Sequence, residues 1–332
     1  MAKLSVRYLL EDEYCKWDEF VDVSPQGNVF NKSFWIKAVS DNFKILVCEE
    51  NKKIVGGIVL TVMYGRFYQN PKLTPQLGIL VGPTENKVKY STYKSKEIEI
   101  TSEIIKALPR FKSFNYNFSY NYTNMLPFIW NNFNIDVKYT YVLENLNDLE
   151  AVHSDFQYDI KYQIKKAKKN ELTVSTEYSI EEFFEVNKKT FDRQGKQMPY
   201  TLEFLKNMDK ILSENNSRKM FFAVDQSDRI IAATYLIYDK NTTYYLMGGA
   251  DPEHRSTGAQ TLLLWESIQF AATVSNNFDF EGSMVPSIEK AFREFGGNQK
   301  IIFNVNKSDK LTQFIYNFAR KNKEIIRKIF KV

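Results

Sequence analysis

The chain has 332 residues, 43% of them hydrophobic and 26% charged, which is enough to bury the cores of two ordinary globular domains. A formal net charge of +5 is well short of the balance of histone-like proteins, so we predict no DNA binding, although phosphorylated ligands suit it. The two cysteines, Cys15 and Cys48, exclude a disulfide framework and indicate a reducing compartment.

No targeting or membrane-spanning segment is predicted. The chain reaches the acidic residues Glu11 and Asp12 before any long apolar run, so no signal peptide is expected. The longest apolar stretch, residues 54–64, is too short for a membrane-spanning helix, which takes about 20 residues. We therefore expect a cytoplasmic protein that can also act at the inner face of the membrane.

The predicted elements of the first half end in a clear strand. Ser33 is expected to cap a helix that runs to about residue 43, and a hairpin over 44–64 follows. Next come a strand at 76–81, between prolines, and a helix at 93–108. Strict alternation over 114–120 then places aromatic side chains on one face of a strand.

In the second half, helices precede strands. Helical spacing predicts helices at 155–169, 180–194, 201–213 and, after a loop, 258–272. The strand patterns lie over 220–238 (a hairpin), 242–247 and 278–280. A hairpin followed by a strand-helix-strand crossover predicts a mixed sheet, so the fold class is α/β.

Two stretches of the first half recur in the second half in the same order. Residues 45–57 align without a gap with residues 221–233, and each is typical of a strand, a polar turn and a strand. Residues 117–133 align with residues 279–295 as strand, turn, short helix and strand. The chain is therefore interpreted as two tandem copies of one domain.

The duplication predicts a domain boundary near residue 148, with an N-terminal domain over 1–148 and a C-terminal domain over 149–332. Only the second copy has a glycine-led loop, Asp251 to Gln260, between a strand and a helix. Backbone N–H groups at the start of that helix would suit a phosphate, with the charge of Arg255 nearby. Donor binding and chemistry are therefore assigned to the second domain, and the first is expected to be a scaffold and a wall of the acceptor site.

Arginine, two residues, then glycine at the head of this helix resembles the acyl-CoA pyrophosphate loop of the GNAT acyltransferase superfamily. The stretch Phe278 to Ser283, followed by Phe295-Gly296-Gly297, resembles the FemAB-like branch, which attaches amino acids or acyl groups to cell-envelope precursors. The basic helix at 158–167 and the strand at 75–78 also resemble that branch. The resemblance covers nearly the whole chain and implies two tandem GNAT-like domains.

Four departures from these family patterns bear on the donor. Gln260 stands where the acyl-CoA loop usually has glycine or alanine, and Lys161 stands where the basic helix usually has arginine. The lysine often found before the Phe-Gly-Gly turn is replaced by Phe292 and Arg293, and no long helical arm of the tRNA-dependent enzymes is visible. Acyl-CoA, such as acetyl-CoA, is the favoured donor, and aminoacyl-tRNA remains an alternative.

The resemblance implies N-acyl transfer to an amino group of a cell-envelope saccharide, an amino sugar or a peptidoglycan precursor. Two alternatives stay open: a tRNA-dependent peptidoglycan aminoacyltransferase, and a binding module without turnover. Acyl transfer to an amine needs a base, and Glu281 is the candidate, with a carboxylate that caps the following turn as the competing interpretation.

Further site residues follow from the same reasoning. The donor-binding candidates are Gly248, Gly249, Arg255, Gly258 and Ala259. The substrate-binding candidates are Lys161, Tyr162, Lys165, Arg193, Tyr235, Tyr245, Ser283 and Arg293. His153 and His254 lack the partner spacing of a metal site, so no metal is expected.

The C-terminal segment from Ile315 to Lys331 is basic and amphipathic. Two interpretations stay open for it: peripheral contact with an anionic membrane, and packing against the second domain.

Overall fold

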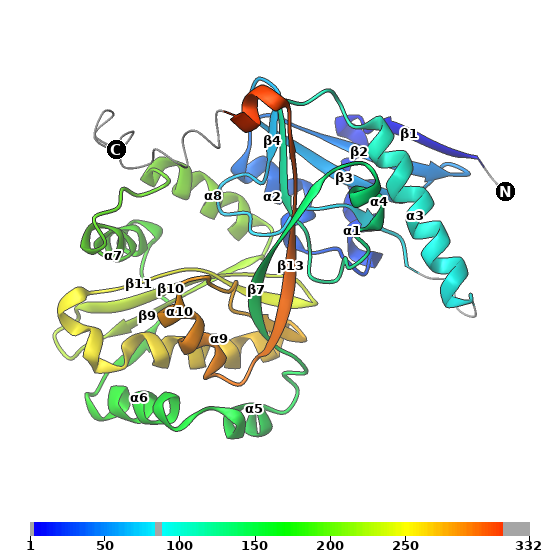
Figure 1. Cartoon of the computed structure of the whole chain (residues 1–332). Coiled ribbons are helices and arrows are strands. Elements are labelled where there is room, and N and C mark those ends of the chain that lie inside the picture. Colours follow the sequence, from blue (N-terminus) through cyan, green and yellow to red (C-terminus); the bar gives the residue numbers. More distant parts are fainter. Residues whose placement is uncertain (1–2, 84–87, 315–332) are drawn as a thin grey trace.

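In a computed structural model that describes residues 3–83 and 88–314, the chain forms a mixed sheet flanked by helices (Figure 1). The amphipathic segment predicted at 315–331 lies outside the described residues. Across the ranges that are described, no helix combines the length and the apolar character needed to cross a membrane.

The first half runs from β1 to β7. Its strands are β1 (Leu4–Tyr8), β2 (Phe43–Glu50), β3 (Lys53–Tyr64), β4 (Phe67–Gln69), β5 (Leu80–Val81), β6 (Ser113–Asn117) and β7 (Asn134–Leu143). Its α-helices are α1 (Tyr14–Val23), α2 (Ser33–Val39), α3 (Tyr90–Ala107) and α4 (Leu126–Trp130), with short 3-10 turns η1 (Glu11–Glu13) and η2 (Val29–Asn31).

The second half runs from α5 to β13. Its α-helices are α5 (Leu149–Asp155), α6 (Tyr158–Lys169), α7 (Ile180–Arg193), α8 (Leu202–Glu214), α9 (Ala259–Val274) and α10 (Pro286–Arg293). Its strands are β8 (Thr173–Ser175), β9 (Arg218–Val224), β10 (Ile230–Tyr238), β11 (Thr242–Ala250), β12 (Asn277–Asp279) and β13 (Asn298–Ser308), with the 3-10 turn η3 (Pro252–Thr257).

Both predicted repeats are confirmed. β2 pairs antiparallel with β3, and β9 pairs antiparallel with β10, as the apolar stretches on either side of a polar turn indicate. In the second hairpin Arg229 reaches back across the turn to Asp225, with 2.8 Å between Nε and Oδ2. The second repeat is also present, since β6, α4 and β7 recur as β12, α10 and β13.

Three predicted boundaries differ. Helix α2 ends at Val39, and the N-cap is Lys32, because the Ser33 hydroxyl donates to Asp18 Oδ2 over 2.6 Å instead of capping the helix. The strand predicted at 76–81 pairs only over β5, and the strand predicted at 114–120 ends at Asn117. There the carbonyl of Asn117 accepts a hydrogen bond from Leu77 N, which ties the end of β6 to the 76–79 segment.

The two halves exchange their last described strands. β7 leaves the first half to pair antiparallel with β12, with Leu143 opposite Phe278. β13 returns to pair antiparallel with β6, with Asn304 opposite Asn117. The two exchanged strands also pair with each other, and Figure 1 shows them side by side between the halves. The domains predicted from chain order therefore share strands in space.

A hydrophobic core joins the halves as well. One buried cluster contains side chains of the first half together with α7, α8 and one face of β9–β11, and the rings of Phe30 and Tyr244 lie 4.8 Å apart within it. The second cluster lies on the other face, where α6 and α9 cover the same strands. Burial on both faces of β10 explains why its sequence is apolar at every position from Ile231 to Ala233.

Candidate acyl-transfer site

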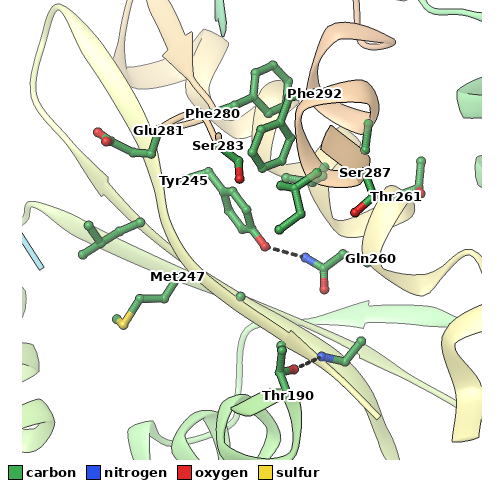
Figure 2. A pocket seen from close by; sticks show the side chains of 18 of the residues that line it. Thr190, Tyr245, Met247, Gln260, Thr261, Phe280, Glu281, Ser283, Ser287 and Phe292 are labelled. Carbon is green, nitrogen blue, oxygen red and sulfur yellow. Dashed lines mark hydrogen bonds between the residues drawn. The ribbon is translucent and has the colours of Figure 1, made fainter. Parts of the chain in front are cut away.

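A cavity opens where two parallel strands separate. β11 pairs with β12 only from Thr242 opposite Asn277 to Tyr244 opposite Asp279, although β11 continues to Ala250. Beyond this pairing the opening between the strands holds a cavity of about 820 Å³, shown in Figure 2. An elongated ligand can therefore enter the sheet between β11 and the segment that follows β12.

Both halves of the chain line this cavity. The second half supplies β11, the start of α9, the end of α7 and part of α10, and the first half supplies the segment 71–75. Phe280 stacks on Phe292 with 5.2 Å between ring centroids, which fixes α10 against the end of β12. Such ring pairs stabilise a fold by about 0.5 to 1.5 kcal/mol beyond the area they bury.

Two arginines lie in the cavity wall without counter-charges. Arg193 ends α7, and Arg255 lies in η3 just before α9. Neither makes an ion pair with a described residue. Because the first N–H groups of a helix are not used within it, the start of α9 adds partial positive charge here. This part of the cavity can bind an anionic group such as a phosphate.

Gly258 is required by the way the loop meets α6. Its φ is +85°, and a Cβ atom there would lie 2.3 Å from the carbonyl oxygen of Gln163. Asn170, at the end of α6, also donates from its side-chain Nδ2 to Thr257 O over 3.3 Å, and this hydrogen bond holds the loop on α6 as well. A side chain at 258 would push the loop off this helix and move the start of α9.

Tyr245 and Gln260 form a polar pair inside the cavity. Gln260 Nε2 donates to the Tyr245 hydroxyl over 3.0 Å, as Figure 2 shows. The other amide atom, Gln260 Oε1, is buried without a hydrogen-bond partner among the described residues. Gly248 makes room for the tyrosine, because a Cβ atom at 248 would lie 1.9 Å from its hydroxyl oxygen.

Glu281 lies two residues after the end of β12 in a left-handed conformation, with a φ of +59°. It contributes to the cavity wall, but Figure 2 shows its carboxylate turned away from Tyr245 and Gln260. Both carboxylate oxygens are buried and have no described hydrogen-bond partner. Burial, reinforced by the nearby carboxyl of Asp279, raises the pKa of Glu281 well above its ordinary value, because both disfavour the charged form.

Asp279 is the last residue of β12 and is completely buried. Its Oδ1 accepts from Thr140 Oγ1 over 2.5 Å and from the backbone N–H of Glu281 over 2.8 Å. Its Oδ2 accepts from Gln76 Nε2 over 3.3 Å. Burial raises the pKa of Asp279 to about 6, and these hydrogen bonds limit the rise because they favour the charged form.

Seven of the residues predicted from sequence lie together in the cavity wall: Arg193, Tyr245, Gly248, Gly249, Arg255, Glu281 and Ser283. The other seven lie outside it: Lys161, Tyr162, Lys165, Tyr235, Gly258, Ala259 and Arg293.

The structure shows where each of these seven residues lies. The Tyr235 hydroxyl donates to Asp209 over 2.8 Å in the buried core. Arg293 pairs with Glu289 over 2.9 Å, and Lys161 donates to a backbone carbonyl of α5. Tyr162 stacks on the exposed ring of Tyr158, while Lys165 is exposed on the same helix. Gly258 and Ala259 are buried at the contact with α6.

Several wall residues carry no signal that sequence reasoning could use. Thr190 supports the wall from α7, where its hydroxyl accepts from Ala250 N over 3.2 Å. Ser287 and Ile288 line the cavity from α10, and Thr74 lines it from the first half. These are common residue types at positions that only the fold brings together.

One described group of side chains could hold a metal ion. Ligand atoms of Asp251, Glu253 and His254 lie within 4.8 Å of one another. Asp251 is already paired with Lys189 over 2.7 Å, which competes with a cation for that carboxylate.

Comparison with known proteins agrees with this geometry. Residues 154–280 match the family model of the acetyltransferase (GNAT) domain. The crystal structure of FemX is 12% identical, with a TM-score of 0.67 over 94% of this chain and 99% of that one. A tandem GNAT protein of the clavulanic acid pathway is 11% identical, with a TM-score of 0.54 over 91% and 98%.

L-PGS from Bacillus licheniformis is 9% identical, with a TM-score of 0.55 over 92% of this chain and 95% of that one. No curated protein matches the sequence. Identities this low establish a shared fold, and a substrate carried over from these proteins is a proposal.

Proposed function

We propose that this chain transfers an acyl group from acyl-CoA to an amine as a tandem-domain, FemAB-like member of the GNAT superfamily. The match of residues 154–280 to the GNAT domain and the fold shared with FemX and a tandem GNAT protein support this proposal. The acceptor is an amino group of a cell-envelope saccharide or its precursor. One observation carries the donor assignment: the cavity between β11 and β12 is bounded by the start of α9 and by two arginines without counter-charges.

The donor would lie along this cavity. Its phosphates would meet Arg193, Arg255 and the N–H groups at the start of α9, because cations and helix N-termini both favour anions. Its pantetheine arm and acyl group would run between the separated strands toward Glu281. The GNAT protein of the clavulanic acid pathway is described without AcCoA, which supports a donor of this kind for the fold.

The reaction needs one base and releases CoA as a thiol. An acceptor ammonium loses a proton to the Glu281 carboxylate, and the free amine attacks the thioester carbonyl. A C–N bond forms, the C–S bond breaks, and the thiolate leaves as CoA after taking up a proton. Burial raises the pKa of Glu281 in the free protein, and the positive charge of the bound ammonium opposes that rise and favours the carboxylate that acts as the base.

The acceptor class rests on the neighbours. FemX and L-PGS share the fold over more than nine tenths of this chain, which supports an envelope acceptor. The segment 71–75 of the first half lines the same cavity, which supports an acceptor site between the halves.

Calorimetry with acetyl-CoA tests the donor. We expect the double substitution Arg193→Gln and Arg255→Gln to weaken binding by about 10-fold to 100-fold, since each removes a charge-assisted contact. Arg293→Gln is the matched control, because Arg293 lies outside the cavity and pairs with Glu289. The donor assignment is wrong if no acyl-CoA binds while charged tRNA supports transfer.

A second donor, aminoacyl-tRNA, is favoured by one observation. The exposed face of α6 carries Lys165, Lys168 and Lys169 beside the stacked rings of Tyr158 and Tyr162, and the same helix contacts the loop before α9. Lysines that displace counterions predict tRNA affinity that falls steeply with salt. Weak affinity without that salt dependence would remove this alternative.

The remaining alternative, a binding module without turnover, predicts no acyl transfer to any amine. In that case Glu281→Gln would change nothing in a transfer assay that compares it with the unmodified protein.

A further inference from the structure

Three buried oxygen atoms at the boundary between the halves have no donor among the described residues. They are Oε1 of Gln76, from the first half, and both carboxylate oxygens of Glu281, from the second. Gln76 is only 1% exposed, so water does not satisfy it from the surface. Buried acceptors without a partner cost about 1 to 3 kcal/mol each, and those that a native structure keeps call for an explanation, such as a ligand that binds there.

Both side chains are fixed by the same carboxyl. Gln76 Nε2 and the backbone N–H of Glu281 each donate to Asp279. The amide of Gln76 cannot turn around without placing its oxygen against the Asp279 carboxylate, which would repel it. Asp279 therefore holds Gln76 in the orientation that presents its oxygen as a free acceptor.

The cluster has no described counter-charge. Neither Asp279 nor Glu281 forms an ion pair with any lysine, arginine or histidine of the described residues. Burial raises the pKa of the Tyr120 and Tyr244 phenols, and the nearby carboxyls of Asp279 and Glu281 raise it further, but a phenol supplies no positive charge. What this cluster lacks is a small cation with several N–H donors.

We propose that Gln76, Asp279 and Glu281 form a recognition site for the primary ammonium group of the acceptor. The proposal rests on the proposed acylation of an amine and names the residues that select it. A primary ammonium has three N–H donors, and three oxygens are without one. A hydroxyl would satisfy one of the three and leave the charge of the cluster unbalanced.

The site also distinguishes substrate from product. After acylation the nitrogen keeps one N–H and loses its positive charge, so two of the three oxygens lose their donor and the Glu281 carboxylate loses its counter-charge. Glu281 belongs to the cavity wall, and Gln76 follows directly on Thr74 and Pro75, which line the same cavity. The first half would therefore act in acceptor selection and in product release.

Binding of glucosamine without any donor tests the site, with N-acetylglucosamine and glucose as controls that differ only at the amino position. We expect glucosamine alone to bind the full chain, and Gln76→Leu or Glu281→Gln to weaken it by about 10-fold to 100-fold. Calorimetry at neutral pH in two buffers of different ionisation enthalpy should show proton release on binding, which Glu281→Gln should abolish.

Acetyl-CoA affinity serves as the measure of folding for both variants, because neither residue contacts the donor's proposed phosphate site. Should Gln76→Leu lose that affinity, Glu281→Gln, which keeps the size of the side chain, decides alone. Equal binding of the three sugars, or displacement of glucosamine by potassium ions at equal concentration, overturns the ammonium site.

The two proposals fail separately. If acetyl-CoA binds and glucosamine shows no preference over its controls, the ammonium site is wrong and the donor site stands. If glucosamine binds through Gln76 but no acyl transfer to any amine occurs, the ammonium site stands and the proposed function is wrong.

Discussion

The backbone N–H of Glu281 donates a hydrogen bond of 2.8 Å to Oδ1 of Asp279. The residue proposed as the base is thereby attached to a buried carboxyl that precedes it by two positions. Any change in the charge of Asp279 therefore acts directly on the position and the pKa of Glu281.

Stability should fall as the pH rises through the range in which Asp279 ionises. Its pKa is raised from 3.8 to about 6, so between these values the native protein binds more protons than the unfolded chain. By linkage the free energy of unfolding then decreases with pH, by ~3 kcal/mol for this group. The raised pKa of Glu281 extends the loss to higher pH.

Urea unfolding of the unmodified protein and Asp279→Asn, from pH ~4 to pH ~7, measures this effect. The difference between the two stability curves should change across this range, because the variant has no carboxyl to ionise there. Parallel curves would mean that Asp279 ionises as easily in the fold as in the unfolded chain.

Thr140 should be needed to hold Asp279. Its hydroxyl donates to Asp279 Oδ1 over 2.5 Å, and Thr140 is fully buried. Thr140→Val should cost ~1 to 3 kcal/mol in the free energy of unfolding, because a buried carboxyl loses a donor. Thr140→Ser keeps the hydroxyl and is the control, with a much smaller expected loss in the same urea titration. Equal losses would point to packing of the methyl group.

Gly258 should tolerate a side chain less well than another left-handed glycine. At Gly195, where φ is +61°, a Cβ atom would meet nothing within 4 Å, whereas a Cβ atom at Gly258 would lie 2.3 Å from the carbonyl oxygen of Gln163. Gly195→Ala should cost only the backbone strain of ~1 to 2 kcal/mol, and Gly258→Ala should cost at least ~3 kcal/mol. Urea unfolding of the two variants side by side checks this, and similar losses would contradict the close contact with α6.

Removal of the Gln260 side chain should improve donor binding. Its Oε1 is buried without a partner among the described residues, and its side chain lies in the cavity proposed for acyl-CoA. Gln260→Ala should strengthen acetyl-CoA binding by ~5-fold in calorimetry, because the cavity gains space and loses an unpaired acceptor. Tyr245→Phe removes only the hydroxyl that Gln260 contacts and is the matched control. Weaker binding by Gln260→Ala would instead mean that the amide contacts the donor.

The local elements were predictable, and the sharing of strands was not. The hairpin at residues 220–238 follows from two apolar stretches around a polar turn, and the loop before α9 follows from its glycine and arginine. The local sequence does not indicate that β13 pairs with β6, because an alternating strand can pair with any open sheet edge of similar polarity.

The residues proposed to bind the acceptor were also only partly predictable from the sequence. Glu281 could be singled out because it lies in the stretch that resembles the FemAB-like branch and because acyl transfer to an amine needs a base. Gln76 could not, because its partner Asp279 is 203 positions away and a glutamine between proline and leucine is typical of an ordinary surface turn. Its burial arises only when the two halves close on each other.

The exchange of β7 and β13 also sets the order in which the protein can fold during synthesis. Asn117 and Asn304, which face each other across β6 and β13, are 187 positions apart. At a synthesis rate of about 5 to 20 residues per second, the edge of β6 stays unpaired on the ribosome for roughly 10 to 40 seconds. An unpaired edge strand can pair with other chains. We therefore expect aggregation and chaperone binding to be strongest after the first half has been synthesised and before β13 has.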